Sequence, residues 1–592
     1  MKYLLINLKS YKKESILAPL FKMLEALFDL FVPLVVADII NIGIGRQDRA
    51  YIFRHCGLLV LLALIGIICS FSAQYFAAKA SVGCATGLRH ALFAHIQTLG
   101  FSEIDTLGTS TLLTRMTADI NQVQNGVNMF LRLFLRSPFI VFGAMVMAFT
   151  INFRIALIFV ITIPALAVII FGLMRITAPL YQAAQSRVDH ILGITRENLT
   201  GVRVIRAFGK EQSEIRRFEE ADEDLTKMQL FVGRVSALMN PLTYVVVNLA
   251  VIAILQMGAG SVDSGILQKG DIVALVNYMS QILVELVKLA NLVVLLSKAM
   301  ACLNRVAGIL DTEPAMKFTH EGAKEESTAA GYGNRQGHEA LQEAAPQNAV
   351  TFSHVSLTYA GAGEESLTDI SFTAKRGQTI GVIGGTGSGK SSLVNLIPRF
   401  YDAAKGTVTI LDRPASQWEK EALRAAVGIV PQKAQLFAGT IRSNLLWGNP
   451  EASEEELWRA LEIAQAAEVV KGKPLGMEEP VEQVGRNFSG GQKQRLTIAR
   501  ALVRNPQILI LDDSASALDF ATDAALRKAL GTLPETLTVF LVSQRTSSLK
   551  HADLILVLED GHLADQGTHE ELLERCEVYR EIHESQFRKG EA

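Results

Sequence analysis

A glycine-rich segment, GGTGSGKS, occupies residues 384–391 and directly follows the apolar run TIGVI. A strand that enters such a turn and then opens a helix directs backbone N–H groups at the phosphates of a nucleotide. Lys390 is long enough to reach the β- and γ-phosphates, and the Ser391 hydroxyl is placed to hold Mg²⁺. We therefore predict a site for ATP and Mg²⁺. The residues expected to contact the nucleotide here are Gly384, Thr386, Gly387, Ser388, Gly389, Lys390, Ser391 and Ser392.

Two adjacent carboxylates, Asp512 and Asp513, follow a second apolar run, ILIL. A buried strand that ends in a carboxylate places an oxygen ligand for Mg²⁺ beside the phosphates, either directly or through water, and Asp512 is the expected ligand. Between the two motifs lies NFSGGQKQR, residues 487–495, in which Ser489 is expected to open a helix. The order of the three motifs is far more specific than the glycine-rich loop alone.

This order of motifs resembles the ATP-binding cassette (ABC) superfamily, whose signature LSGGQ is matched with Phe488 at the leucine position. The resemblance implies that Tyr359 stacks on adenine and that Gln432 lies at the interface with a membrane domain and helps to bind Mg²⁺ with Ser391 and Asp512. It also implies that Asp519 bridges two cassettes. In this family the signature residues contact an ATP bound by a second cassette, and here they are Ser489, Gly490, Gly491 and Gln492.

Two positions depart from the family pattern, and both belong to the catalytic part of the same ATP site. Asp513 stands where the family has a glutamate that orients the attacking water, and Gln544 stands where it has a histidine. A carboxylate one methylene shorter sits about 1 Å back, and such a displacement costs about a hundredfold in rate. Glutamine donates hydrogen bonds but carries no positive charge. We therefore expect the ATP site of this chain to hydrolyse ATP slowly and its signature to be intact. We also expect its partner to be a second, non-identical half-transporter. The alternative is an active homodimer that tolerates both residues.

The composition predicts a membrane part joined to a soluble part. The 592 residues are 49% hydrophobic and 20% charged, with a mean hydropathy of +0.26. The net charge of −2 provides no general attraction to nucleic acid. About 20 apolar residues cross a bilayer. Six stretches of this kind are expected, at 17–42, 57–78, 127–151, 155–174, 235–257 and 271–296.

The predicted fold class is an α-helical membrane domain with six transmembrane helices and long cytoplasmic extensions, followed by an α/β ATP-binding cassette. The expected boundaries are 1–311 for the membrane domain, 312–348 for a polar linker and 349–592 for the cassette. In the cassette, short β-rich runs alternate with helical patterns, as in a largely parallel sheet. The expected strands are 350–359, 378–383, 508–513, 539–543 and 554–558.

Other features concern coupling and the transport path. The resemblance implies short transverse helices that press on the cassettes, and we place them within 108–119 and 207–218. Ionisable residues at membrane depth are costly unless they are paired or face a wet cavity. One interpretation is that they line an acidic cavity wall suited to cationic amphipathic substrates; the other is that Lys22–Glu25 and Glu285–Lys288 are structural pairs. The residues are Lys22, Glu25, Asp29, Glu285 and Lys288.

Together these features predict a multi-pass protein of the plasma (inner) membrane with its cassette in the cytoplasm. The resemblance implies an ABC exporter half-transporter that couples ATP hydrolysis to export of small amphipathic molecules of the multidrug type. Its expected partners are a second, non-identical half-transporter, membrane lipids and the substrate, and no nucleic acid. Two alternatives are an ATP-gated channel or regulator and a homodimeric lipid or drug exporter.

Overall fold

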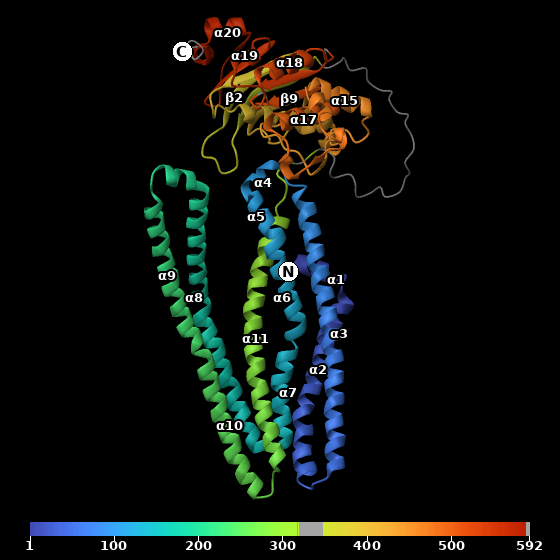
Figure 1. Ribbon diagram of the computed structural model, residues 1–592, viewed down its shortest axis with the longest axis vertical. Helices are drawn as coiled ribbons and strands as arrows, with labels where there is room; N and C mark the ends of the chain where they lie inside the picture. The colour runs from blue at the N-terminus through green and yellow to red at the C-terminus, as the bar shows by residue number, and fades with distance from the viewer. Residues whose placement is uncertain (317, 319–346, 515, 535, 588–592) are drawn as a thin grey trace. The chain divides into compact units, whose positions relative to one another are not determined.

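The computed structural model describes residues 1–592 except 317, 319–346, 515, 535 and 588–592 (Figure 1). The chain forms two compact units. The first contains Met1–Gln97 and Ser110–Thr312, and the second contains Thr98–Thr109 and Glu313–Ala592. The predicted linker at 312–348 lies almost wholly outside the described residues.

The first unit is a bundle of long helices (Figure 1). Six helical segments among the described residues are long and apolar enough to cross a membrane, which confirms the six predicted spans. They extend beyond the predicted apolar cores because the helices continue as polar segments. The spans are Lys12–Ile44, Arg49–Ile96, Thr109–Ile151, Phe153–Ala207, Glu211–Asp263 and Lys269–Leu310.

Some spans are single helices and others are interrupted. The uninterrupted helices are α3 (Arg49–Ile96), α8 (Phe153–Ala207) and α11 (Lys269–Leu310). The first span is α2 (Lys12–Asp38), which ends in a π-helical turn. The third span contains α5 (Thr109–Thr114), a π-helical turn, α6 (Ile120–Leu133) and α7 (Arg136–Ile151). The fifth span consists of α9 (Glu211–Ala237) and α10 (Met239–Asp263). A short helix, α1 (Lys2–Lys9), precedes them.

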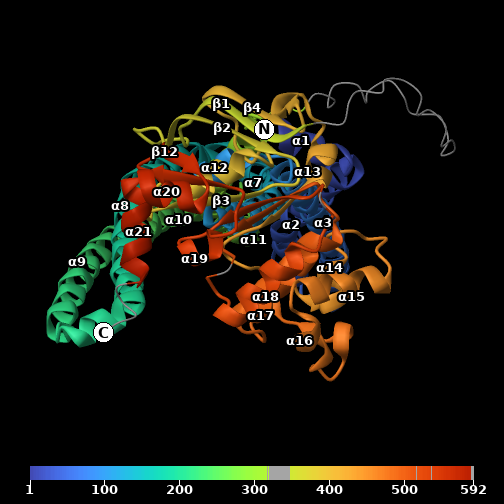
Figure 2. The same ribbon diagram turned by 90° about the horizontal axis from the view of Figure 1, so that it is seen from above.

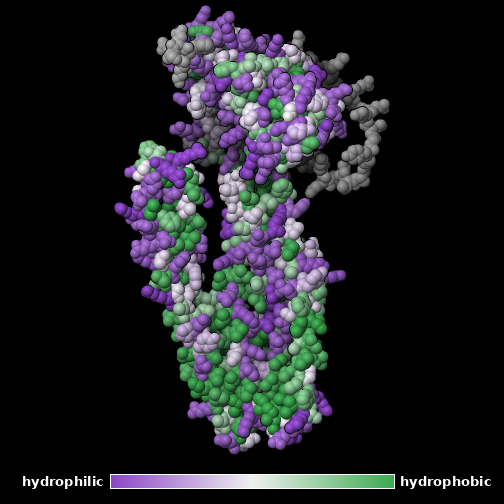
Figure 3. Space-filling model, in the orientation of Figure 1, coloured by the Kyte–Doolittle hydropathy of each residue, from purple (hydrophilic) through white to green (hydrophobic). Residues whose placement is uncertain are grey.

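Helix packing in this unit relies on small residues and on a few buried polar contacts. Ala18 and Ala26 of α2 and Ala73 and Ala77 of α3 are fully buried, and small side chains allow the two helices to approach closely. The Tyr278 hydroxyl of α11 donates a 2.6 Å hydrogen bond to a backbone carbonyl of α2. In Figure 3 apolar side chains cover one half of the bundle, as expected of a surface that faces lipid.

The outer turn between the third and fourth spans is as short as the sequence predicts. α7 ends at Ile151 and α8 begins at Phe153, so one residue separates them. That residue, Asn152, caps α8, because its side-chain oxygen accepts hydrogen bonds from the backbone N–H groups of Arg154 and Ile155 at 3.0 and 3.2 Å. The cap fixes the start of a helix 55 residues long.

The second unit contains a six-stranded sheet in the order β12-β11-β3-β10-β9-β6 and a four-stranded antiparallel sheet in the order β2-β1-β4-β5. In the larger sheet β11, β3, β10, β9 and β6 run parallel, and β12 is antiparallel. Its strands are β3 (Thr379–Gly384), β6 (Val427–Val430), β9 (Ile508–Asp512), β10 (Thr538–Val542), β11 (Leu554–Glu559) and β12 (His562–Gly567).

The five predicted strands are confirmed to within two residues, and five that the sequence analysis did not identify, one of them only two residues long, complete the two main sheets. The first strand is β1 (Asn348–Leu357). Besides β6 and β12, the unpredicted strands are β2 (Leu367–Lys375) and β4 (Lys405–Ile410). A two-residue edge strand, β5 (Arg413–Pro414), lies beside β4. β4 presents mostly exposed side chains, which explains its weak sequence signal.

Helices pack on both sides of the larger sheet. α12 (Lys390–Leu396) belongs to a core that includes the buried Phe352 and Phe372 of the four-stranded sheet. A second core contains α14 (Ile441–Leu445), α15 (Glu454–Ile463) and α17 (Gly490–Val503). In Figure 2 these three helices lie together, on the side of this unit away from β1, β2 and β4.

A short helix between the second and third spans, α4 (Phe101–Leu107), packs on the cassette and not on the membrane bundle. The ring of Phe101 stacks on Phe400 with centroids 4.4 Å apart, and the Tyr401 hydroxyl donates a 2.6 Å hydrogen bond to Asp105. Burial, reinforced by Asp105, raises the pKa of Tyr401. The predicted location of this transverse helix, 108–119, is therefore wrong: Gly108, with φ +74°, ends α4, and the next residues begin the third span.

The second predicted transverse segment, 207–218, forms a turn between two long helices. α8 ends at Ala207, and α9 begins at Glu211. Gly209, with φ +59°, allows the chain to reverse between them. The structure thus contains a sharp turn at the predicted position; its proposed action on a cassette stays a prediction.

Candidate nucleotide-binding site

The glycine-rich loop runs from the end of β3 to the start of α12, as predicted. Gly387 and Gly389 have φ values of +86° and +93°, a backbone conformation that favours glycine. A Cβ atom on Gly389 would lie 2.9 Å from the Ser366 carbonyl oxygen and 2.7 Å from a Leu367 methyl group. The loop can therefore wrap closely around a phosphate only with glycine at this position.

Lys390 lies across the loop that precedes it. Its Nζ donates hydrogen bonds to the carbonyl oxygens of Gly384 and Gly385 at 2.9 and 2.5 Å. Burial lowers the pKa of Lys390, and the carboxylates of Asp513 and Asp512 oppose that shift. The negative charge of a bound triphosphate would compensate the positive charge of this half-buried ammonium group.

The residues predicted to hold Mg²⁺ meet beside this loop. The Ser391 hydroxyl donates a 3.1 Å hydrogen bond to Asp512, which is 6% exposed at the end of β9. Burial is the main cause of the raised pKa of Asp512, and the charge of Asp513 adds to it. A hydroxyl and a carboxylate are hard oxygen donors of the kind that Mg²⁺ prefers, and Gln432 lines the same cavity. The residues present therefore fit this ion.

These elements border one cavity of about 1060 Å³. It is lined by all of the residues predicted to bind ATP, Mg²⁺ or the attacking water on this chain except Tyr359 and Gly384. The Tyr359 hydroxyl donates a 2.9 Å hydrogen bond to Ser392, and its ring meets Tyr401 edge to face at 5.0 Å. Its stacking on adenine stays a prediction. The predicted residues on the wall are Thr386, Gly387, Ser388, Gly389, Lys390, Ser391, Ser392, Gln432, Asp512, Asp513 and Gln544.

The two unusual residues, Asp513 and Gln544, line this same cavity. Asp513 has φ +44°, and its carboxylate accepts a 3.2 Å hydrogen bond from the Gln432 side-chain amide. The Gln544 backbone carbonyl accepts a 2.7 Å hydrogen bond from Gln586 of α21 (Glu577–Phe587). Gln586 also accepts hydrogen bonds from Thr546, so α21 holds the turn that carries Gln544. Both departures thus belong to one site by position as well as by sequence.

The signature residues begin α17. The Ser489 hydroxyl accepts from the Gln492 backbone N–H at 3.3 Å, and the Gln492 side chain accepts from the Ser489 N–H at 3.1 Å. This reciprocal cap fixes the helix start. The residues Ser489, Gly490, Gly491 and Gln492 do not line the cavity described above. Such a placement agrees with their predicted role opposite a second cassette.

Asp519, the predicted bridge between cassettes, caps α18 (Phe520–Leu530). Its carboxylate accepts hydrogen bonds from the backbone N–H and the hydroxyl of Thr522 at 2.8 and 2.9 Å. These bonds, the backbone one foremost, lower the pKa of Asp519. Its contact with a second cassette stays a prediction.

Two loops on the cavity wall escaped the sequence analysis. One joins β1 to β2 and contributes Glu365, which forms a 2.8 Å ion pair with Lys405. The other is the tight turn between β11 and β12, where Asp560 and Gly561 have positive φ values. An Asp-Gly pair between two apolar runs indicates a hairpin turn, so only the second loop had a readable signal.

Comparison with known proteins agrees with this architecture. The family model described as "ABC transporter transmembrane region" matches residues 15–286, and that described as "ABC transporter" matches residues 367–516. The uncharacterized ABC transporter ATP-binding protein YfiB of Bacillus subtilis is 34% identical over 98% of this chain and 97% of its own length. A probable multidrug resistance ABC transporter ATP-binding/permease protein of the same organism, YheI, is 30% identical over 98% and 96%.

Two further matches extend these comparisons. The ATP-dependent lipid A-core flippase of Vibrio vulnificus is 27% identical over 98% of this chain and 97% of its own length. A solved structure of a bacterial Atm1-family ABC exporter with ATP bound has a TM-score of 0.77 at 23% identity and covers 99% of both chains, a likeness in fold. The chain belongs to the ABC transporter family. It is a multi-pass membrane protein with a cytoplasmic ATP-binding domain, and its ATPase is coupled to export.

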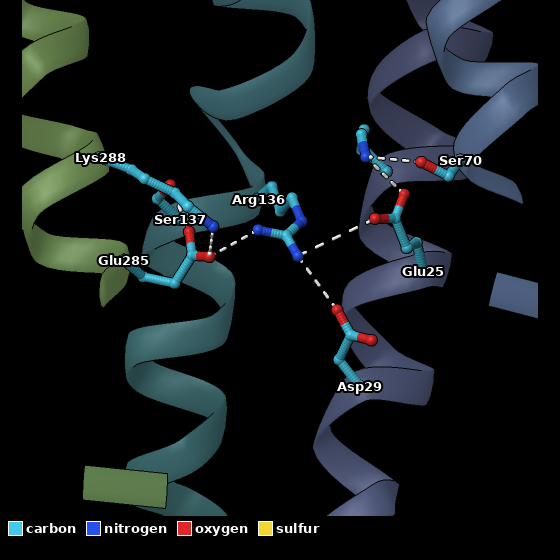
Figure 4. Close-up of polar contacts among 8 residues, drawn as sticks. Glu25, Asp29, Ser70, Arg136, Ser137, Glu285 and Lys288 are labelled. Carbon is cyan, nitrogen blue, oxygen red and sulfur yellow. Dashed lines mark hydrogen bonds and ion pairs between the residues drawn. The ribbon is translucent and has the colours of Figure 1, made fainter. Parts of the chain in front are cut away.

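The charged residues predicted in the first and sixth spans form one network with Arg136, a residue that sequence analysis did not select (Figure 4). The Arg136 guanidinium contacts Glu285 at 2.6 Å, Asp29 at 3.0 Å and Glu25 at 3.9 Å. Both predicted pairs are present, Lys22–Glu25 at 2.6 Å and Glu285–Lys288 at 2.8 Å. Three carboxylates thus meet three cations. The predicted acidic wall is wrong, because the network carries no net charge.

Weakening the contact between α4 and the cassette should impair coupling. We expect Phe101→Ala combined with Tyr401→Phe to lower transport about tenfold, since it removes an aromatic stack and a hydrogen bond worth about 1 kcal/mol each. ATP binding should remain, because neither side chain lines the nucleotide cavity. The measurement compares vesicle transport with binding of a fluorescent ATP analogue. Phe153→Ala, in the exposed outer turn, is the matched control, and unchanged transport in the double variant would contradict this role of α4.

Proposed function

We propose that this chain is one half of a heterodimeric exporter of small amphipathic molecules, in which its own ATP site hydrolyses slowly. The observation that carries the proposal is that Asp513 and Gln544 both line the nucleotide cavity. The shorter carboxylate also accepts a hydrogen bond from the Gln432 side-chain amide. The names of the relatives, a probable multidrug resistance transporter and a lipid A-core flippase, support amphipathic substrates.

The proposed cycle gives the two ATP sites different duties. At the slow site this chain supplies the glycine-rich loop, Lys390, Ser391 and Asp512, which bind and hold the triphosphate. At the second site the partner supplies its own loop and carboxylate, and this chain contributes the helix start at Ser489. When bound, Mg²⁺ neutralises charge on the β- and γ-phosphates. Binding of two ATP molecules draws the cassettes together, and hydrolysis at the partner's loop resets them.

The proposal is tested by ATPase activity of the purified chain and of the chain co-purified with a second half-transporter, both in lipid nanodiscs. We expect the pair to turn over about a hundredfold faster, because only the pair contains a complete catalytic carboxylate. Within the pair, Ser489→Arg in this chain should abolish the fast activity, whereas Asp513→Asn in this chain should leave most of it.

Brisk hydrolysis by the single chain, equal to that of the pair, would contradict the proposal and favour the homodimeric exporter. A separate measurement addresses the channel alternative. Concentrative, vanadate-sensitive uptake into inside-out vesicles is expected of a pump, and ATP-dependent passive flux would indicate a channel or regulator.

A further inference from the structure

The charged network borders a cavity of about 500 Å³ within the helical unit, between α2, α7 and α11. Its wall has a polar part and an apolar part. The polar part includes Asn277, Ser280 and Gln281 on one face of α11, and the apolar part includes Val32 and Val284. A cavity with both parts fits an amphiphile, with its headgroup at the network and its tail against the apolar wall.

The cavity lies at a defined depth, because three helices bring charged residues to the same level. Asp29, Arg136 and Glu285 each lie 15 or 16 residues from the outer end of their span, which corresponds to about 22–24 Å along a helix. The hydrocarbon core of a bilayer is about 30 Å thick. The network therefore lies in the inner part of the membrane, where an unpaired charge is costly.

The third span is interrupted at the network. α6 ends at Leu133 and α7 begins at Arg136, so the first N–H groups of α7 lie in the membrane without partners within the helix. The Glu285 carboxylate accepts a 2.8 Å hydrogen bond from the side-chain hydroxyl of Ser137, in the first turn of α7. A negative charge at a helix N-terminus is favourable. Broken helices at membrane depth occur where backbone lines a cavity or is enclosed by protein.

Only two members of the network present much of their charge to the cavity, and these have opposite signs. The side chains of Asp29 and Lys288 are 45% and 43% exposed, whereas those of Arg136 and Glu285 are 12% and 4% exposed. Gln281 Oε1 and Arg136 Nε are buried and lack a hydrogen-bond partner among the described residues. A ligand in the cavity thus meets one exposed acceptor, the Asp29 carboxylate, and one exposed donor, the Lys288 ammonium group.

We propose that this cavity binds the headgroup of a zwitterionic amphiphile, with its cationic group at Asp29 and its anionic group at Lys288. A purely cationic ligand would gain Asp29 but lie beside two cations, and a purely anionic ligand would lie beside Asp29. The inference rests on the proposed export function, because it names the substrate class of that transporter. It replaces the cationic class that an acidic wall would favour.

The test measures binding to the purified chain in nanodiscs, without ATP. The probes are three fluorescent amphiphiles that share a dansyl group and an octyl chain and end in an amino-carboxylate zwitterion, a primary ammonium or a carboxylate. Wild type should bind the zwitterion about tenfold more tightly than the other two. Asp29→Asn should weaken the zwitterion about tenfold and make the carboxylate the preferred probe. Lys288→Gln should weaken it similarly and favour the ammonium probe.

Matched controls lie on the same helices. Asp38→Asn on α2 and Lys298→Gln on α11 change exposed charges outside the cavity lining and should leave the order of the probes unchanged, as should Lys288→Arg, which keeps the charge. Comparison among probes within one variant removes the effect of the amount of folded protein. Equal affinities for the three probes in wild type, or an unchanged order in both variants, would overturn the inference. The ATPase comparison above would still decide the proposed function independently.

Discussion

Replacing Asp513 with glutamate and Gln544 with histidine is expected to raise the ATPase activity of the purified chain about a hundredfold. The glutamate restores the methylene that extends the carboxylate toward the attacking water. The histidine restores a group that can carry positive charge near the γ-phosphate. The rest of the site is complete, since the loop, Lys390, Ser391 and Asp512 already line one cavity.

The single chain suits this measurement because a self-associated pair would present two copies of the same site to two intact signatures. Only the two substituted residues then limit the rate. Each single substitution should recover part of the activity, and Asp513→Glu should recover more, because it acts on the nucleophile. Adding Lys390→Ala to the restored chain is the control and should return activity to background. A restored chain no faster than wild type would show that the slow step lies elsewhere.

Removing Arg136 should destabilise the helical unit by about 3–5 kcal/mol, the range found when one member of a buried ion pair is deleted. Arg136→Leu leaves Asp29 with no ion-pair partner among the described residues, and Glu285 keeps only Lys288. An uncompensated carboxylate at this depth is costly. The measurement is the thermal unfolding midpoint of the purified chain in nanodiscs, which should fall markedly.

A neutral replacement of the same contacts distinguishes loss of charge balance from loss of packing. Arg136→Gln combined with Asp29→Asn removes one cation and one carboxylate and keeps the pairs Lys22–Glu25 and Glu285–Lys288, so most of the stability should return. Arg154→Leu, in the exposed outer turn, is the matched control and should have little effect, as surface substitutions usually do. If Arg136→Leu unfolds at the same temperature as wild type, the network contributes no stability.

The nucleotide site shows how far sequence reasoning extends when the contacts are local. In the loop at 384–391, each residue acts within one turn that its neighbours define, so type and spacing were sufficient. The position of Asp512 at the end of β9 was predictable in the same way, because the short apolar run before it indicates a buried strand. The contact of the Tyr359 hydroxyl with Ser392 joins residues 33 positions apart and is not local; the stacking of this ring on adenine stays a prediction.

The transverse helix illustrates a boundary that sequence pattern did not resolve. The predicted range of this helix, 108–119, begins at Gly108, whereas in the structure Gly108 ends the helix α4. Glycine suits either end of a helix, because a left-handed backbone conformation occurs where the chain changes direction. The stacking of Phe101 on Phe400 decides between them, and those residues are far apart in the chain.

The sequence alone determined the six spans and the motifs of the cassette, because length, hydropathy and local spacing fix each of them. The two unusual positions, Asp513 and Gln544, were identified through the resemblance to the family pattern. Only the tertiary structure decided the charge balance within the membrane. Arg136 meets Asp29 and Glu285 across 107 and 149 residues, respectively, through helices whose rotation depends on packing. No local pattern encodes such a meeting, since the electrostatic energy of a charge depends on which neighbours the fold brings to it.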